Sequence, residues 1–360
     1  MIFFVSGEYP PDIGGVGDYT ARLRNALEQS GWLTAVASRQ HVRRWNAGGL
    51  VWLLRHVPRH GVVHIQYQAA AYGLLGDICL VPWLLRRLRP DLRIATTFHD
   101  ARVPYLFPRA GSVRSAAVQL LARASDAVIA ADSRDLRVLG GPSPRHHHIP
   151  IGANVECAPP PGYDRETFRC GLGIAPEDLA VAYFGTFNVS KGVTLLIRAF
   201  ERILSTEPKA RLLLLGGAAG ASDPTDRMAA AGVQDRISRL GSQVIRTGWL
   251  QPSELSAYLL AGDVALLPYV DGASARRGSL LACAAHGLPI VSTRPAAKEV
   301  AEYVDAVAPS PDDLAETILR TWRDPTPLRA ASRALAEDVS WPNIAVRHIE
   351  VYERLLYSRR

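Results

Sequence analysis

The stretch FGTFNVSKGVTLLIRAF at residues 184–200 decides the fold class of this chain. It continues the apolar run Leu179–Phe184, which predicts a buried strand, and passes through a glycine turn into an amphipathic segment that predicts a helix. Alternating strands and helices indicate parallel sheets with helices on both faces, an α/β fold. The other apolar runs of this kind are Ile2–Ser6, Val62–Gln66, Ile94–Phe98, Ala127–Ala131, His148–Ile151, Leu212–Leu215, Val264–Leu267 and Ile290–Val291.

The strand and helix pattern runs twice, and the 360 residues are enough for two domains. Three successive prolines, 159–161, lie between the two series and favour a stiff connection. We therefore expect a first domain at 1–155, a linker at 156–169 and a second domain at 170–338. A last amphipathic helix within 339–360 begins at Trp341, and its own periodicity does not indicate where it packs.

Composition limits the class of protein. Hydrophobic residues make up 48% of the chain and charged residues 21%, as in ordinary globular proteins. The four cysteines form no C-x-x-C pair, which argues against a disulfide framework or a zinc cluster and favours a reducing compartment. No apolar stretch reaches the roughly 20 residues that a membrane-spanning helix needs.

The net charge of +7 is unevenly distributed. Residues 1–160 hold 18 basic and 11 acidic side chains, so they carry the whole excess, whereas residues 161–360 hold 23 of each sign. A basic excess attracts nucleic acid, anionic lipid or phosphorylated substrates. The charge alone leaves these three classes of partner open.

A glycine-rich turn follows the first predicted strand, in EYPPDIGGVGDY at residues 8–19. Gly14, Gly15 and Gly17 would let backbone amides approach an anion at the start of the next helix. The turn lacks both the G-x-G-x-x-G spacing of dinucleotide-binding proteins and the G-K-S/T of a Walker motif. It is either a phosphate-binding loop or a plain strand-to-helix turn.

Lys191 lies just before the helix predicted in the opening stretch. A cation at a helix N-terminus is unfavourable unless an anion lies between them, so a bound phosphate would explain this lysine. Lysine is also rare here, with three against 38 arginines. The alternative is a solvated lysine at a helix start.

A third turn, in LLPYVDGASARRGSLLACAAHGLP at residues 266–289, places Arg276 and Arg277 before a helix that begins at Gly278 and Ser279. The reasoning given for Lys191 applies to these arginines as well, because they too are cations at a helix N-terminus. All three turns follow strands, and in open α/β sheets ligands bind beyond the carboxyl ends of the strands.

His99 and Asp100 lie just beyond another predicted strand. A neutral imidazole there could donate a hydrogen bond to a sugar hydroxyl or a phosphate, or act as general acid or base. A capping His-Asp pair is the alternative. The three adjacent histidines 146–148 predict no metal site, because neighbours on a strand point to opposite faces.

Taken together and in this order, the motifs resemble those of the GT-B glycosyltransferases of the retaining family-4 type, the glycosyl transferases group 1. The resemblance covers nearly the whole chain. The matching stretches are YPPDIGGVGDY (9–19), TFHD (97–100), DSRD (132–135), HIPIGANV (148–155), FGTFNVSKGVTLLIRAF (184–200), LLLLGG (212–217), TGWLQPSEL (247–255), AGDVALLPY (261–269) and HGLPIVST (286–293).

The resemblance implies two Rossmann-like domains facing a cleft, with the acceptor mainly on the first and the nucleotide sugar mainly on the second, and a terminal helix that returns to the first. It implies a hexosyltransferase of the EC 2.4 type that retains the anomeric configuration without a metal or other cofactor. His99 and Lys191 would be the catalytic residues. The donor diphosphate would be bound by Gly14, Gly15, Lys191, Arg276, Arg277, Gly278 and Ser279, the donor sugar or ribose by Asp100, Ser274 and Glu299, and the base by Gly248, Trp249 and Leu250.

The sequence departs from the family pattern at three charged positions. Thr186 stands where an arginine is usual, and Ser274 and Ala282 stand where two glutamates are usual. We expect Arg276 or Arg277 to replace the missing arginine at the diphosphate. The missing glutamates motivate an alternative, a degenerate GT-B protein that binds a nucleotide sugar without transferring it.

The resemblance implies a sugar, a lipid-linked or polysaccharide precursor, or a small molecule as acceptor. The basic first half mixes arginines with tryptophans and leucines, which suits an anionic membrane surface, although these apolar groups could equally face the core. Nucleic acid is not expected, since no known binding module accompanies the charge. The expected location is the cytoplasm, with peripheral contact at the inner face of the plasma membrane as an option.

Overall fold

The computed structural model describes residues 1–12, 14–42, 44–73, 77–101, 111–187, 191–217 and 233–357, the side chains of 111–114 excepted. The chain forms two compact units. The first unit contains residues 1–152 and 339–360, and the second contains residues 153–338.

A six-stranded parallel sheet forms the centre of the first unit, with the strand order β2-β1-β3-β4-β5-β6. The order reverses at β1, which pairs with both β2 and β3. The strands are β1 (Ile2–Ser6), β2 (Thr34–Ala37), β3 (Gly61–Tyr67), β4 (Leu92–Phe98), β5 (Ala127–Ala130) and β6 (His146–His148). The last strand therefore begins and ends earlier than the run His148–Ile151 that its sequence suggests.

Helices cover both faces of this sheet because alternate strand residues point to opposite sides. On one face, Ile2 and Phe4 pack with α1 (Gly15–Gln29) and α13 (Trp341–Tyr357) in one core. On the other face, Phe3 and Val5 pack with a second set of helices. The helices that contribute side chains to that second core are α2 (Ala47–His56), η1 (Asp77–Leu80), α3 (Val81–Leu88), α4 (Gly111–Ala124) and α5 (Ser133–Val138).

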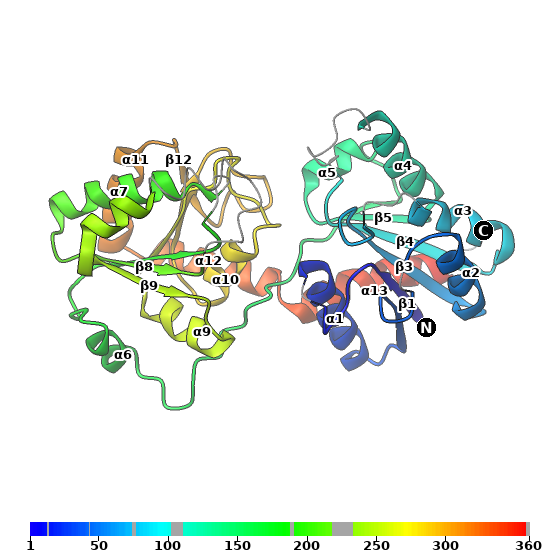
Figure 1. The fold of residues 1–360 in the computed structure, drawn as a ribbon, viewed down its shortest axis with the longest axis horizontal. Coiled ribbons are helices and arrows are strands. Elements are labelled where there is room, and N and C mark those ends of the chain that lie inside the picture. Colours follow the sequence, from blue (N-terminus) through cyan, green and yellow to red (C-terminus); the bar gives the residue numbers. More distant parts are fainter. Residues whose placement is uncertain are drawn as a thin grey trace. The chain divides into compact units, whose positions relative to one another are not determined.

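The terminal helix α13 belongs to the first unit, as Figure 1 shows by its red ribbon beside the blue α1. Its apolar face buries Ile344, Ala345, Val351 and Tyr352 in the core that α1 completes. At its start, the Trp341 ring lies so close to Gly152 that a Cβ there would approach ring atoms to 2.6 Å. Its own periodicity leaves the docking place of this helix open, but the family resemblance implies a return to the first domain, and the structure places the helix there, against α1 and β3.

The second unit repeats the architecture with the strand order β12-β11-β10-β7-β8-β9, again all parallel. The strands are β7 (Ala180–Phe184), β8 (Arg211–Leu215), β9 (Val244–Gly248), β10 (Val264–Leu267), β11 (Ile290–Thr293) and β12 (Asp305–Val307). Figure 1 shows α7 (Val193–Thr206) and α11 (Pro311–Arg323) together on one face, and α9 (Pro252–Ala261) and α10 (Gly278–Ala285) toward the other. The helix α12 (Thr326–Asp338) packs on α10.

The expected linker at 156–169 differs from what the structure shows, because this segment packs on the second unit. It includes the start of α6 (Arg165–Gly171), and the side chain of Arg169 is buried. Arg169 donates hydrogen bonds to the Ala261 carbonyl at 2.9 Å and to Asp263 at 3.0 Å. A proline run indicates stiffness, but it cannot show that neighbouring side chains dock on a domain.

Candidate functional site

In the second unit, the candidate site begins where the strand order reverses, between the carboxyl ends of β7 and β10. Such a switch point leaves a crevice, because the connections from the two strands depart to opposite sides. Gly192 is the N-cap of α7 and adopts the left-handed conformation, with φ of 69°. A Cβ there would lie 1.8 Å from the Pro268 carbonyl, so only glycine lets the turn after β7 approach the turn after β10.

Three cations gather at this crevice around the buried ring of Tyr269. The Lys191 ammonium lies 5.2 Å from the ring centroid, and the Arg277 guanidinium lies 4.8 Å from it. Arg277 forms an ion pair with Asp271, and Arg276 lies 3.8 Å from the same carboxylate. We call Lys191, Tyr269, Asp271, Arg276 and Arg277 the cation cluster. It combines three positive charges with one negative charge.

Electrostatics at the cation cluster weaken the charge of Lys191. Desolvation, followed by the nearby Arg277, lowers the pKa of Lys191 to about 8, while Asp271 opposes this shift. A lysine that loses water and faces another cation is stabilised by an incoming anion. The cluster therefore has the charge and the partial burial that a phosphate group would compensate.

The helix α10 adds its N-terminus to the cation cluster. Arg277 is its N-cap, and Gly278 and Ser279 are its first two residues. The Ser279 hydroxyl is hydrogen-bonded to the Tyr269 hydroxyl at 2.7 Å, so this side chain fixes the ring that supports the cations. Two of the expected diphosphate residues thus lie beside Arg276 and Arg277, at a helix end that favours anions.

The positions that lack the family glutamates are closed to solvent. Ser274 and Ala282 are both completely buried, and the Ser274 hydroxyl bonds to no described group. The expected contact of Ser274 with a sugar or a ribose stays a prediction. The segment that carries Glu299 lies beside the Ser274 loop, because the Ala297 amide donates to the Ala273 carbonyl at 2.8 Å.

A cavity of about 420 Å³ opens beside the carboxyl ends of β7, β8 and β9. The three residues expected at the base, Gly248, Trp249 and Leu250, all line it, and the Trp249 side chain is 88% exposed. Its other lining residues are Val155, Phe184, Gly185, Thr186, Gly216, Gly217, Pro252 and Leu255. An apolar, glycine-rich wall suits a flat ring that stacks and meets backbone groups.

The glycine turn of the first unit has different surroundings. Gly14 is the N-cap of α1, and a Cβ on it would lie 1.9 Å from a Glu8 carboxylate oxygen, while Gly15 is exposed. Desolvation raises the pKa of Glu8, and Asp12 and Asp18 raise it further, although Arg39 opposes them. Carboxylates therefore surround the turn that we expected to bind phosphate.

His99 and Asp100 follow β4 in the first unit, and both are half-buried. The His99 Nε2 atom lies 2.8 Å from the Gln66 Oε1 atom, and the imidazole meets the Tyr19 ring edge to face at 4.8 Å between centroids. Desolvation, with a smaller effect of His348, lowers the pKa of His99 to about 3. The imidazole is thus neutral at physiological pH, which suits hydrogen bonding better than proton donation.

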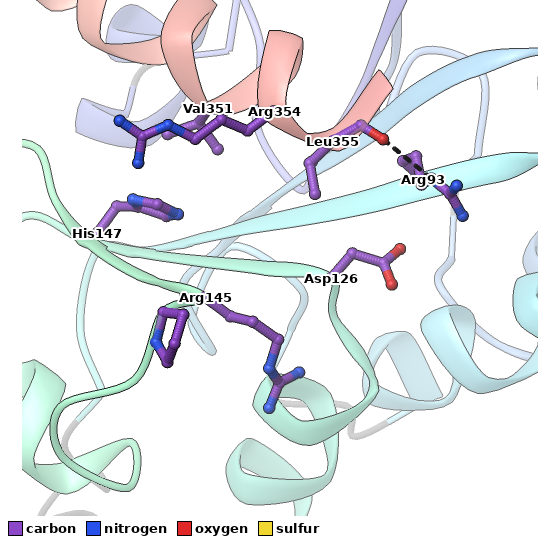
Figure 2. A pocket seen from close by; sticks show the side chains of 8 residues that line it. Arg93, Asp126, Arg145, His147, Val351, Arg354 and Leu355 are labelled. Carbon is purple, nitrogen blue, oxygen red and sulfur yellow. Dashed lines mark hydrogen bonds between the residues drawn. The ribbon is translucent and has the colours of Figure 1, made fainter. Parts of the chain in front are cut away.

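A second cavity, of about 330 Å³, lies at the amino-terminal edge of the first sheet. Figure 2 labels its lining residues Arg93, Asp126, Arg145, His147, Val351, Arg354 and Leu355. In this view the three guanidinium groups point away from one another, and those of Arg93 and Arg145 donate to main-chain carbonyls at 3.0 and 2.6 Å. Because the cations do not converge, we assign no ligand to this cavity.

Sequence reasoning does not single out Tyr269 and Asp271, although both lie in the quoted stretch 266–289. A tyrosine and an aspartate shortly after a strand, five to eight residues before two arginines, could have indicated a support and a counter-ion. Among the described residues, no three or more His, Cys, Asp or Glu side chains form a group that could hold a metal ion. No described helix has the length and apolarity needed to cross a membrane.

Comparison with solved structures defines the fold. The chain superimposes over 99% of its length on sucrose-phosphate synthase from Thermosynechococcus elongatus, with a TM-score of 0.73 and 19% identity, covering 99% of that chain. It matches the Anabaena protein HepE, solved in complex with UDP, with a TM-score of 0.73 and 18% identity over 98% of this chain and all of that one. The fold is GT-B, with two Rossmann-like parallel-sheet units.

The sequence of the second unit matches a known family. Residues 178–324, which are less than half of the chain, match the family model described as Glycosyl transferases group 1. The resemblance to GT-B glycosyltransferases of the group 1 type is thereby confirmed. The match includes every member of the cation cluster.

Curated relatives agree with this family. The chain is 27% identical to a D-inositol 3-phosphate glycosyltransferase of Corynebacterium diphtheriae over 69% of this chain and 58% of that protein. It is 26% identical to the phosphatidylinositol N-acetylglucosaminyltransferase gpi3 subunit of Schizosaccharomyces pombe over 53% of this chain and 41% of that protein. The chain therefore spans about half the length of these relatives.

Proposed function

We propose that this protein is a hexosyltransferase that moves a sugar from a nucleoside-diphosphate sugar to an acceptor hydroxyl. The observation that carries the proposal is the cation cluster, in which Lys191 and Arg277 lie against the Tyr269 ring and Arg276 lies near the same Asp271 as Arg277, beside the N-terminus of α10. The cavity next to it has room for a nucleoside. The Anabaena protein HepE, a structural neighbour solved in complex with UDP and with UDP-glucose, supports the same donor class.

The chemistry that these residues can perform is electrostatic. As the bond from the sugar to the diphosphate breaks, negative charge grows on the leaving group, and preorganised cations stabilise it. Lys191 and Arg277 supply that charge from a partly desolvated position, where it acts more strongly than in water. We propose that transfer retains the anomeric configuration and requires no metal, and that His99 contacts the donor sugar.

In this proposal, Arg276 or Arg277 takes the place of the arginine that the family usually has at position 186. Thr186 lies on the wall of the cavity, at the place where an arginine is usual, and Arg276 and Arg277 reach the crevice from the other side of the switch point. Each charge-assisted hydrogen bond to the diphosphate contributes about 1.5 to 3 kcal/mol. Loss of either contact therefore weakens donor binding by roughly 10- to 150-fold.

Donor binding tests this assignment. A thermal-shift and calorimetric comparison of UDP, GDP and ADP should show stabilisation of the protein by one of them, and Arg276→Ala or Arg277→Ala should weaken that binding. Arg202→Ala is the matched control, because Arg202 is exposed on α7 and pairs with Asp312 outside the crevice. Unchanged affinity in both Arg276 and Arg277 variants would disprove the replacement.

The acceptor is proposed more broadly, as a sugar, a lipid-linked precursor or a small polyol. Two relatives are named as a D-inositol 3-phosphate glycosyltransferase and a phosphatidylinositol N-acetylglucosaminyltransferase subunit. Inositol phosphates should therefore be among the acceptors that are tested. Transfer should be followed by mass spectrometry with the nucleotide sugar chosen by the binding screen. NMR of the product's anomeric proton then tests retention, and activity in the presence of EDTA tests metal independence.

A second candidate is a degenerate GT-B protein that binds a nucleotide sugar without transfer. The observation that favours it is that Ser274 and Ala282, both buried, stand where the family usually has glutamates, so neither position carries a carboxylate. Tight diphosphate binding without hydrolysis or transfer across the acceptor panel would support this candidate. Turnover with any acceptor would exclude it.

We also propose that the first unit contacts anionic membranes from the cytoplasmic side, through α3 and its neighbours. Trp83 is 50% exposed, while Leu85, on the side of α3 opposite Trp83, is buried; Leu88, the last residue of the helix, is 58% exposed. The Arg87 guanidinium lies 5.6 Å from the Trp83 ring. Exposed apolar groups beside arginines suit an interface, where each cation contributes about 1 kcal/mol.

Co-sedimentation with anionic vesicles tests the membrane proposal. Binding at low salt should fall when Trp83→Ser removes the exposed ring, and it should be absent with neutral vesicles. Trp249→Ser is the matched control, because Trp249 is also exposed but lies in the second unit. Equal loss in both variants, or no binding at low salt, would contradict the proposal.

A further inference from the structure

A line of buried polar side chains crosses the first unit from α13 to His99. The Tyr352 hydroxyl lies 2.7 Å from His64 Nδ1, His64 Nε2 lies 3.2 Å from Gln66 Nε2, and Gln66 Oε1 lies 2.8 Å from His99 Nε2. Thr97 joins at His64 Nε2 with a distance of 2.8 Å. Of these residues only His99 reaches solvent, because the other four are at most 1% exposed.

The position of His64 and Gln66 in the sheet makes this line unusual. Both lie on β3, which is buried along its whole length, and they point to the face where Phe4 and Ala95 form the apolar core. Polar groups in such a place are costly unless each is hydrogen-bonded. Apolar side chains at these positions would avoid this cost, which indicates that the polar side chains have a role other than packing.

The amide of Gln66 sets the positions of the protons. Its oxygen can only accept, so His99 donates from Nε2. Its nitrogen can only donate, so His64 accepts at Nε2 and, being neutral, carries its own proton on Nδ1. Burial keeps the pKa of His64 well below its usual value, which agrees with a neutral ring.

We propose that Gln66 is a positioning residue that holds His99 as the Nε2–H tautomer, so that Nδ1 accepts a hydrogen bond from a hydroxyl group of the ligand. The identity of that ligand as a donor sugar rests on the function proposed above. The assignment of the His99 tautomer is independent of that function, because it follows from the hydrogen bond with Gln66. No described group forms a hydrogen bond with His99 Nδ1, and its other nitrogen is occupied by Gln66.

This arrangement selects a class of sugar. A lone pair on Nδ1 attracts a hydroxyl hydrogen and repels a carboxylate oxygen, which has no hydrogen to offer. The low pKa of His99 means that the ring does not become a cation to pair with a carboxylate at neutral pH. The structure therefore favours a neutral hexose over a uronic acid on the same nucleotide.

Nitrogen-15 NMR of the histidine-labelled full-length protein tests the tautomer directly. We expect the two His99 nitrogens to show the Nε2–H form between pH 6 and 8, and the His64 nitrogens to show the Nδ1–H form. Protonation of His99 on Nδ1 would mean that the Gln66 amide is oriented the other way, and it would overturn the proposal.

Variants separate positioning from packing. Gln66→Leu should mix the two His99 tautomers, whereas Gln66→Glu keeps an acceptor and should restore Nε2–H while raising the pKa of His99. Thr96→Val is the matched control, since Thr96 is buried on β4 but bonds to Ser125 on the opposite face. If the His99 tautomer responds to Thr96→Val as it does to Gln66→Leu, the role of Gln66 is only structural.

Donor selectivity gives a second readout. The wild type should bind a nucleoside-diphosphate hexose roughly tenfold or more tightly than the matching uronic acid, as expected when one hydrogen bond is replaced by repulsion. Gln66→Leu should reduce this ratio while leaving binding of the free nucleoside diphosphate unchanged. Equal affinity of the wild type for both sugars would overturn the selectivity. If no nucleotide binds at all, the proposed function fails, and the tautomer measurement still decides the role of Gln66.

Discussion

Each unit has a glycine turn between a strand and a helix at the point where the strand order reverses, but the charges around the two turns have opposite signs. In the first unit, desolvation raises the pKa of Glu8 near Gly14, Arg39 lowers it, and Asp12 and Asp18 raise it. In the second unit, the corresponding turn brings Lys191 beside the Arg277 that follows β10. The same local fold therefore has mainly acidic neighbours in one unit and mainly basic neighbours in the other.

This contrast shows that net charge and site charge are different properties. The whole excess of +7 lies in the first 160 residues, where it does not gather at the glycine turn. The second half has no net charge, yet its switch point combines three cations with one carboxylate. The strand, glycine turn and helix thus define the position of a possible binding site. The side chains that follow the neighbouring strand define the charge of that site.

The largest effect is expected from removal of the lysine. Lys191→Ala should weaken nucleoside-diphosphate binding by roughly 10- to 150-fold, because one charge-assisted contact of about 1.5 to 3 kcal/mol is lost. Titration calorimetry measures it. Lys209→Ala is the control, since Lys209 is an exposed lysine of the same unit. A change below twofold in Lys191→Ala would remove the lysine from the site.

The next effect is a dependence on pH. With a pKa of about 8, Lys191 is mostly charged at pH 7 and mostly neutral at pH 9, so diphosphate affinity should fall about tenfold as pH rises between these values. Binding at pH 9 should also take up a proton, which calorimetry in buffers of different ionisation enthalpy detects. Lys191→Arg should flatten the profile, and a wild-type profile that is already flat would contradict the shifted pKa.

Removal of the counter-ion should act in the opposite direction. Asp271→Asn deletes the carboxylate that pairs with Arg277, so the diphosphate no longer competes with it. Because partly exposed ion pairs contribute about 0.2 to 1 kcal/mol, affinity at pH 6.5 should rise roughly 1.4- to fivefold. Weaker binding would mean that Asp271 orients the arginines and does not compete with the ligand.

The smallest effect is expected in the first unit. Glu8→Gln removes an acid beside Gly14, and we expect diphosphate affinity to change by less than twofold, since the cation cluster holds the diphosphate. The change in diphosphate affinity should be compared with that of Asp271→Asn in the same assay. Equal strengthening by both variants would show that the glycine turn of the first unit also binds the diphosphate, as the family resemblance implies.

The sequence predicts the inner strands well and the edge strands poorly. Runs such as Ile2–Ser6 and Val264–Leu267 coincide with β1 and β10, which are buried on both faces and therefore continuously apolar. The strands β2, β9 and β12 lie at sheet edges, are only partly buried and give no such run. The fourth edge strand, β6, is predicted two residues too late.

The sequence predicts site residues that are marked by their place at a helix start. It does not predict those whose role depends on contacts with residues far away in the chain. Helix starts indicate Lys191, Arg276 and Arg277, because a cation there needs an explanation. The sequence cannot show that Ser274 is buried or that Gln66 bonds to His99, because these facts depend on residues far apart in the chain. Alternation along β3 would place Gln66 in the core, but not beside a particular histidine.

The return of α13 to the first unit has a consequence for folding on the ribosome. Residues 153–338 are continuous and can form the second unit as soon as they emerge. The first unit must wait for residues that are synthesised after the whole second unit, because Ile344, Ala345 and Tyr352 complete its core. Until then His64 and Gln66 lack the cover of α13, so α1 alone packs on this face of the sheet in the nascent chain.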